Sequence, residues 1–194
     1  MDVSISRPTQ PSDPTAASVP EPPALFAAAV YVPGTRDAAE LARFIAALKT
    51  DGVRLGGLIQ EEVFTPEGAR DRIDTVDIAT GERIVINRQT PANRVSHNCS
   101  LDVSALTETS AAIRRAVADG VDLVIIEKFG AQEQTGGGLA DDILHVITEG
   151  VPLLVAVPEP GLDAWQKRTG GMGDQLPYRE QAFRDWWVAS SRAK

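Results

Sequence analysis

Two short polar stretches contain residue types that bind anions, and each follows an apolar run. The first stretch follows residues 25–32 and contains Arg36. The second stretch follows residues 121–126 and contains Lys128. Guanidinium and ammonium groups attract oxyanions, and a nearby glycine lets backbone N–H groups approach the ligand. We therefore predict a site for a small anion. The predicted anion-binding residues are Gly34, Thr35, Arg36, Lys128, Gln132 and Asn98.

The first stretch lies where a nucleotide-binding α/β protein has its phosphate-binding loop. Such a loop follows the pattern G-x-x-x-x-G-K-[S/T], in which the lysine contacts phosphates and the hydroxyl holds Mg²⁺. If Tyr31 takes the first position, the last three fall on residues 36–38, and Asp37 replaces the lysine. The hydroxyl is also missing, which argues against metal-assisted phosphoryl transfer. The simpler alternative is a plain turn in which Asp37 starts a helix.

The second stretch ends an apolar strand, where an active nucleoside triphosphatase needs acidic groups for Mg²⁺ and for water activation. This chain has Glu127 followed by Lys128. Glu127 could reach a metal through water, but Lys128 is a cation at neutral pH and attracts an anion instead. The alternative interpretation is an exposed ion pair between these two neighbours.

The secondary candidates for the site are Glu127, Glu133, His97 and Cys99. Glu133 belongs to a polar segment that ends in glycines at residues 136–138, which we predict to be a mobile loop over the site. His97 and Cys99 are too few to hold a metal, and a catalytic pair would require their side chains to point at each other. We interpret residues 93–99 as a polar lid over the ligand pocket.

The elements that must position these residues alternate along the chain, which predicts an α/β fold. The predicted strands are residues 25–32, 55–59, 121–126 and 151–157, and the predicted helices are residues 37–49, 103–118, 139–149 and 179–189. Residues 72–78 and 82–86 flank Ala79-Thr80-Gly81, which is the pattern of a β-hairpin. We predict one three-layer α/β domain over residues 25–194, with a mostly parallel sheet and a hairpin insertion at about residues 63–90.

Composition narrows the function classes. A net charge of −8 argues against a general nucleic-acid or anionic-membrane binder. Cys99 is the only cysteine, so no intramolecular disulfide can form. No apolar run approaches the roughly 20 residues of a membrane span, and the N-terminus lacks the pattern of a signal peptide. We expect no membrane insertion and a cytoplasmic location.

Both ends of the chain differ in composition from the middle. Residues 1–24 hold six of the thirteen prolines, and we predict a disordered tail because such a segment buries too little apolar surface to fold. The last thirty residues contain Trp165, Trp186 and Trp187. Packing against the core is the simpler interpretation of these rings, and a surface for a protein partner is the alternative.

Six runs of the chain carry a family resemblance. They are Val30-Tyr31-Val32-Pro33-Gly34, Gly56-Gly57-Leu58-Ile59-Gln60-Glu61, Asp77-Ile78-Ala79-Thr80-Gly81, Cys99-Ser100-Leu101-Asp102, Glu127-Lys128-Phe129-Gly130-Ala131-Gln132-Glu133 and Val155-Ala156-Val157-Pro158-Glu159. In these runs the chain resembles a bacterial family, the domain of unknown function 2478, over about residues 25–188. Members often lie near molybdate-uptake genes, so the resemblance implies a link to molybdenum handling by association only.

A more distant resemblance is to the small P-loop nucleoside triphosphatases. Residues 53–63 resemble their second strand, where V-G-G-F is followed by E-V, and residues 77–82 resemble their I-V-D-L-x-T-G-E hairpin. Their D-E-I-G strand end aligns with residues 127–130. This resemblance implies the fold but not the activity, because the lysine, the metal-holding hydroxyl and the catalytic acid do not match.

Our leading hypothesis is a non-catalytic, P-loop-like protein with degenerate nucleotide motifs that binds a small anion. The candidate ligands are a nucleotide, phosphate or a molybdate-type oxyanion. One alternative is an active Mg²⁺-dependent nucleoside triphosphatase with an atypical phosphate loop, in which Arg36 replaces the lysine. Another is a regulatory or scaffold protein that binds a partner through its proline-rich tail and its tryptophan segment.

Overall fold

The computed structural model describes residues 24–88 and 103–192. Its strands are β1 (Phe26–Tyr31), β2 (Leu55–Phe64), β3 (Arg70–Asp77), β4 (Arg83–Arg88), β5 (Leu123–Ile126), β6 (Leu153–Pro158) and β7 (Asp174–Pro177). Its helices are α1 (Ala38–Thr50), α3 (Val103–Ala118), α4 (Ala131–Gln134), α5 (Ala140–Thr148), α6 (Leu162–Thr169) and α7 (Glu180–Ser191), with a 3₁₀ turn η1 (Glu159–Gly161). The predicted alternation is confirmed, and α3 has the predicted bounds.

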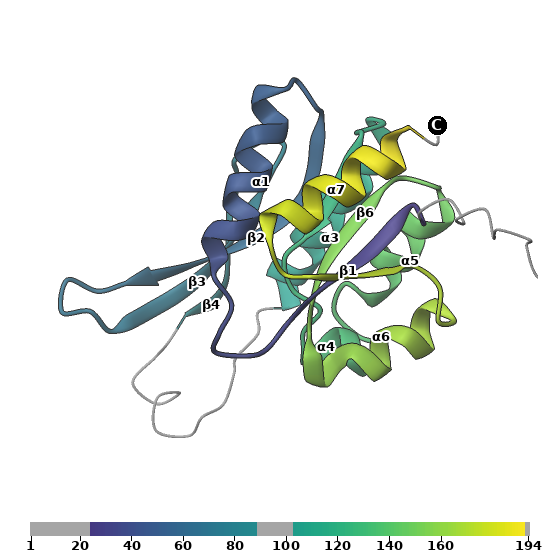
Figure 1. Cartoon of the computed structure of the whole chain (residues 1–194). Coiled ribbons are helices and arrows are strands. Elements are labelled where there is room, and N and C mark those ends of the chain that lie inside the picture. Colours follow the sequence, from purple (N-terminus) through teal and green to yellow (C-terminus); the bar gives the residue numbers. More distant parts are fainter. Residues whose placement is uncertain (1–23, 89–102, 193–194) are drawn as a thin grey trace, which may run out of the picture.

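The described strands form one mixed sheet in the order β4-β3-β2-β5-β6-β1-β7. The strands from β2 to β7 in this order run parallel, whereas β2, β3 and β4 run antiparallel to one another. This confirms the predicted α/β class with a mostly parallel sheet (Figure 1). Because only β6 separates β1 from β5, the ends of these two strands are roughly 10 Å apart, a distance that long side chains can bridge.

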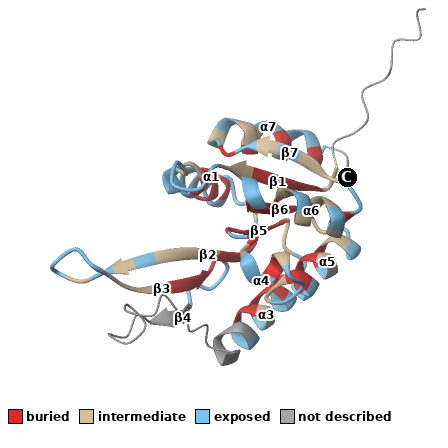
Figure 2. Cartoon of the chain, turned by 90° about the horizontal axis from the view of Figure 1, so that it is seen from below, coloured by how far each residue is buried: buried red, intermediate tan, exposed pale blue. Residues whose placement is uncertain are grey.

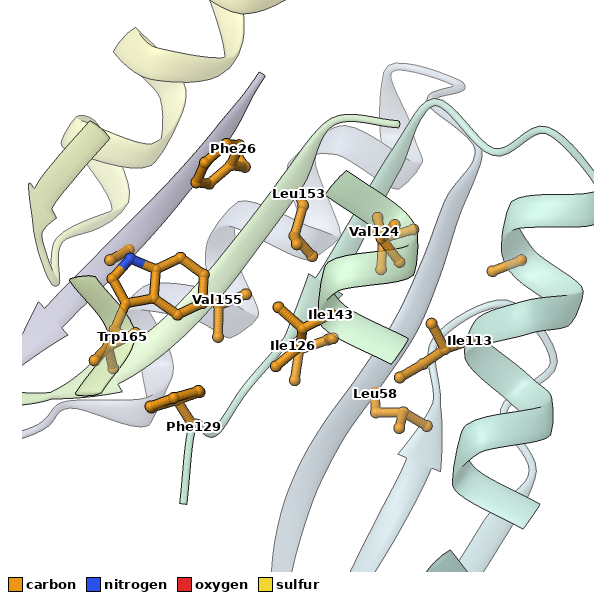
Figure 3. Packing of buried hydrophobic residues seen from close by; sticks show 14 of the residues in the cluster. Phe26, Leu58, Ile113, Val124, Ile126, Phe129, Ile143, Leu153, Val155 and Trp165 are labelled. Atoms are coloured by element: carbon orange, nitrogen blue, oxygen red, sulfur yellow. The ribbon is translucent and has the colours of Figure 1, made fainter. Parts of the chain in front are cut away.

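Helices cover both faces of the parallel part of the sheet, as the three-layer prediction requires. On one face α1 and α7 pack through Phe44 and Phe183. On the other face α3, α5 and α6 pack through Ile113, Ile143 and Trp165, and Figure 3 shows this second core from close by. Figure 2 shows the buried central strands between the two helical layers.

Alternation along β5 decides which way its polar end points. Leu123 and Ile125 pack on the α1–α7 side of the sheet, whereas Val124 and Ile126 pack on the opposite side. Glu127 continues the series of Leu123 and Ile125, since side chains two residues apart share a face. Its carboxylate therefore belongs to the α1–α7 side.

The β3–β4 hairpin joins the main sheet through β2. Strand β2 runs to Phe64, past its predicted end at residue 59, and its second half pairs antiparallel with β3. The prediction ended the strand too early because residues 60–62 are polar. These residues lie in a ribbon that projects beyond the helical layers, where both faces of the strand meet solvent (Figures 1 and 2).

Strand β7 was not predicted from the sequence. Its only large apolar side chain is Leu176, so it lacks the alternation or apolar run that marks a strand. It pairs with β1 at the edge of the sheet. Pro177 is compatible with this position because an edge strand does not need every N–H group for pairing.

The C-terminal tryptophans contribute mostly to the core. Trp165 is 1% exposed and Trp186 is 4% exposed, which confirms the core interpretation for these two rings. Trp187 is partly buried and packs against the α1–α7 core.

The predicted tail falls almost wholly on residues 1–23, which lie outside the described residues, so its disorder stays a prediction. Ala24 belongs to the ordered structure, one residue earlier than expected. Its N–H donates to Asp174 Oδ2 at 3.0 Å, and its carbonyl accepts a hydrogen bond from Trp186 Nε1 at 3.2 Å. Within residues 24–88 and 103–192, no helix has the length and apolar character needed to cross a membrane.

Candidate functional site

Arg36 and Glu127 meet at the carboxyl edge of the sheet. Arg36 lies in the connection from β1 to α1, and Glu127 directly follows β5. Arg36 Nη1 lies 2.9 Å from Glu127 Oε1, so the arginine crosses the end of β6 to reach the acid. Ligands of open α/β sheets bind outside this edge. The structure thus joins the two stretches that the sequence singled out, but as an ion pair.

The connection from β1 to α1 starts with a tight turn. The N–H and Oγ1 of Thr35 both donate to the Val32 carbonyl, at 3.1 and 3.0 Å. Pro33 precedes Gly34, whose φ of +84° suits the third position of a type II turn. Both donors of Thr35 therefore serve the turn itself, and an anion would have to compete with Val32 for them.

Asp37 begins helix α1, as the simpler interpretation of this stretch predicts. It is the N-cap residue, and its Oδ1 accepts a hydrogen bond from the N–H of Ala39 at 2.9 Å. A carboxylate in this position satisfies a free N–H group of the first turn and interacts well with the helix dipole. The residue at the lysine position of the nucleotide pattern thus has a structural role.

The carboxylate of Glu127 is buried and fully engaged. Only 6% of the side chain is exposed. Oε1 binds Arg36, and Oε2 accepts a hydrogen bond from the backbone N–H of Gln60 in β2. Burial raises the pKa of Glu127, and the Gln60 N–H and Arg36 oppose this effect only in part. The interpretation of Glu127 and Lys128 as an exposed ion pair is therefore wrong.

The guanidinium of Arg36 also contacts two tyrosine rings. Its Cζ lies 5.2 Å from the ring centroid of Tyr31 and 5.8 Å from that of Tyr178. These are cation–π distances, and the two rings contact each other edge to face at 5.6 Å. Arg36 is thereby positioned by an acid and two aromatic faces, while a quarter of its side chain stays exposed.

Lys128 does not join this cluster. Its side chain is exposed, and its aliphatic stem lies near Gly130. Phe129, the next residue, is fully buried and packs edge to face on Trp165 at 5.5 Å. The charge of Lys128 is therefore exposed to solvent beside the carboxyl edge, while Arg36 pairs with Glu127.

The segment after Lys128 is ordered by Glu133. Its Oε2 accepts a hydrogen bond from the N–H of Gly130 at 2.7 Å, and its Oε1 accepts one from the N–H of Leu139 at 3.0 Å. The residue is 8% exposed and lies in α4. The prediction of a loop is wrong for residues 131–134, which form α4, and this carboxylate connects both ends of the segment. Gln132 is exposed on α4, with its Oε1 beside Gly137.

The remaining predicted residues, Asn98, His97 and Cys99, lie outside the described residues, as does the proposed lid at 93–99. Within residues 24–88 and 103–192, no group of three or more His, Cys, Asp or Glu side chains is arranged to hold a metal ion.

Sequence reasoning missed the aromatic part of the site. Tyr178 follows β7, and its N–H donates to the Val30 carbonyl at 3.1 Å, which carries its ring to the end of β1. Nothing near Tyr178 in the sequence indicates this contact, because it depends on β7 pairing with β1. Tyr31 ends the first apolar run beside Arg36, and that position was a usable signal.

The fold and the site together define a class of protein. It is a three-layer α/β protein with a mostly parallel sheet and a charged, aromatic cluster at the edge where such sheets bind ligands. The model of one protein family, described as "Protein of unknown function (DUF2478)", matches residues 26–186. This chain belongs to that family, which confirms the family resemblance found in the sequence.

A curated relative is the Molybdenum import ATP-binding protein ModC 2 of Bradyrhizobium diazoefficiens. It is 36% identical over 173 residues, which cover 89% of this chain. The match spans 19% of the relative, so this chain corresponds to about a fifth of that protein's length. No solved structure matches the chain significantly.

Proposed function

We propose that this protein binds a small oxyanion at the carboxyl edge of β1, β5 and β7, without catalysing a reaction on it. The observation that carries the proposal is the position of Arg36. It lies where open α/β sheets bind ligands, it is fixed by Tyr31 and Tyr178, and a quarter of its side chain remains exposed. A guanidinium carries five N–H donors on a rigid fork, so it can bind an oxyanion with more than one hydrogen bond.

The groups at this edge are not suited to bind a nucleotide together with its Mg²⁺ ion. Asp37 takes the lysine position and caps α1, so it repels a phosphate there. Glu127 takes the position of a metal-binding acid, but Arg36 and the Gln60 N–H occupy its two oxygens. No carboxylate of this pair is left to orient a metal or to activate a water, which supports binding without phosphoryl transfer.

An oxyanion would replace Glu127 as the partner of Arg36, or share the guanidinium with it. In either case the carboxylate repels the ligand until it takes up a proton. The raised pKa of Glu127 makes this uptake easier than for a solvent-exposed glutamate. Molybdate carries no proton near neutral pH and would require the uptake, whereas hydrogen phosphate can bring a proton of its own.

Molybdate is the first ligand to test. The relative that shares 36% identity with this chain is named for molybdenum import, and that name supports tetrahedral oxyanions of this kind as candidates. Tungstate has the same shape and charge, and phosphate is a smaller tetrahedral oxyanion. Lys128 and Gln132 follow β5 and are exposed, so they remain candidates for further contacts to the ligand.

Isothermal calorimetry with molybdate, tungstate, phosphate, ATP and GTP tests the proposal. We expect binding of at least one oxyanion below about 1 mM, and a loss of at least tenfold in Arg36→Gln. Arg54→Gln is a matched control, since Arg54 pairs with Asp122 at 3.0 Å before the start of β2, at the opposite edge of the sheet. Absence of binding for all five ligands, or equal losses in both variants, would contradict the proposal.

The same proteins test the main alternative, an active nucleoside triphosphatase. We expect no Mg²⁺-dependent release of phosphate from ATP or GTP above the level of a heat-inactivated sample. Release that disappears in both Arg36→Ala and Glu127→Ala would favour the alternative instead.

A further inference from the structure

The hydroxyl group of Tyr178 is buried without a hydrogen-bond partner among the described residues. The residue is 9% exposed, and its hydroxyl oxygen is one of two buried side-chain atoms in residues 24–88 and 103–192 that lack a partner. Buried hydroxyl groups are nearly always paired, because leaving one unpaired costs the hydration that it had in water. An unpaired donor in a rigid position therefore suggests an acceptor that arrives from outside.

The ring that carries this hydroxyl group cannot easily turn away. The backbone N–H of Tyr178 is bonded to the Val30 carbonyl, and its ring packs edge to face on Phe183 at 5.3 Å and on Tyr31 at 5.6 Å. Burial raises the pKa of Tyr178 above the ordinary value of a tyrosine, so the hydroxyl group keeps its proton at neutral pH and remains a donor.

The unpaired donor lies in the same cluster as the exposed cation. The guanidinium of Arg36 lies over the Tyr178 ring at 5.8 Å, and its other partner is Glu127. A ligand that binds the exposed part of this guanidinium arrives beside the Tyr178 ring that Arg36 contacts. The hydroxyl oxygen itself is buried, so a ligand oxygen reaches it when the side chains around it shift on binding.

We infer that the Tyr178 hydroxyl group is a specificity-determining donor that binds one oxygen of the oxyanion while Arg36 binds another. This inference rests on the proposed function and names the ligand class more closely. Two separate donors suit a tetrahedral oxyanion with at least two unprotonated oxygens. A single-atom anion such as chloride can interact with the charge of Arg36 but cannot reach both groups with separate acceptors.

The test uses Tyr178→Phe in the full-length chain, with molybdate as the ligand and two readouts. Calorimetry should show molybdate binding at least roughly tenfold weaker than in the wild type, which is the lower limit for losing one hydrogen bond to a charged group. Thermal unfolding without ligand should show an equal or higher Tm, because phenylalanine removes an unpaired buried hydroxyl group and keeps the ring.

Thr169→Val is the matched control. It removes another buried hydroxyl group, which donates to the Trp165 carbonyl at 3.0 Å in α6, on the other side of the sheet. We expect its molybdate affinity to equal that of the wild type.

Two results would overturn the inference. One is unchanged molybdate affinity in Tyr178→Phe while Arg36→Gln still weakens binding, which would leave the proposed function standing. The other is a lower Tm of the ligand-free Tyr178→Phe protein, which would mean that the hydroxyl group already has a partner. Failure of the proposed function has a different signature, since the wild type would then bind no oxyanion at all.

Discussion

Replacing Glu127 with glutamine tests whether this acid competes with a ligand for Arg36. The change removes the negative charge, keeps the shape of the side chain and leaves an oxygen to accept the Gln60 N–H. Arg36 then keeps its two tyrosine contacts but loses its charged partner. We expect Glu127→Gln to bind molybdate more tightly than the wild type.

The size of the effect follows from the geometry of the pair. Glu127 Oε1 lies 2.9 Å from the guanidinium, so a ligand on another edge of the fork would lie roughly 6 Å from the carboxylate. At an effective dielectric constant of about 20, that repulsion is about 3 kcal/mol per unit charge, or about 6 kcal/mol for the doubly charged molybdate before screening. Solvent reaches a quarter of Arg36, so screening leaves about 1–2 kcal/mol. The dissociation constant should therefore fall roughly five- to thirtyfold.

The pH dependence supplies a second readout from the same titrations. Burial raises the pKa of Glu127 above that of an exposed glutamate, so lowering the pH from neutral into the acid range increases its protonated fraction. Wild-type affinity for molybdate should rise over this range as the repulsion disappears, and the affinity of Glu127→Gln should change less.

The same pKa shift affects stability with a definite sign. A carboxyl whose folded-state pKa is raised holds a proton that the unfolded chain has already released, so its contribution to stability falls as pH rises through that interval. The difference in stability between Glu127→Gln and the wild type should therefore shift in favour of the variant with increasing pH. Unchanged or weaker molybdate binding by a variant with a native circular dichroism spectrum would refute the competition between Glu127 and the ligand.

Three further predictions concern the groups that build the edge. Arg36→Met should lower the free energy of unfolding by about 2 kcal/mol at about pH 8, because it leaves a buried carboxylate unpaired; urea denaturation should show a smaller loss at lower pH, where Glu127 takes up a proton. Gly57→Ala should cost at least about 3 kcal/mol in the same assay, since φ is +103° and a Cβ would lie 2.0 Å from the Ile125 carbonyl oxygen. Glu133→Gln should cost about 1–3 kcal/mol, because its NH₂ would meet a backbone N–H, while calorimetry shows unchanged molybdate affinity.

Each of these has an outcome that contradicts it. Stability of Arg36→Met that is independent of pH would mean that Glu127 does not titrate in the unpaired site. A fully stable Gly57→Ala would show that β2 and β5 can separate locally. Gly120→Ala provides its comparison, because φ is +64° there but a Cβ would meet open space. Weaker molybdate binding in Glu133→Gln would show that Glu133 contributes to the anion site, as the sequence predicted.

Local sequence patterns were enough to predict most of the framework. The apolar spacing of residues 103–118 predicted α3 with its observed bounds, and the apolar run before Glu127 predicted β5. The position of Asp37 at the start of α1 was predictable because an N-cap side chain accepts a hydrogen bond from an N–H group in the first turn of its own helix. Such features depend on neighbours a few residues away, so one stretch of chain contains the whole signal.

Strand ends and edge strands were less predictable. Residues 60–62 look like a loop because they are polar, yet they continue β2 in the projecting ribbon. Strand β7 has too few apolar residues to show any period, and it exists because the free edge of β1 accepts it. In both cases pairing with another strand supplies the hydrogen bonds that the local sequence does not indicate.

The sequence by itself determined which groups lie at the carboxyl edge, namely Arg36 after the first strand and Glu127 after β5. Only the tertiary structure decided that these two pair with each other, that Lys128 turns to solvent, and that Tyr178 joins Arg36. The strand order places β6 between β1 and β5 and β7 beside β1. That order brings together residues far apart in the chain, and no pattern of neighbouring residues records it.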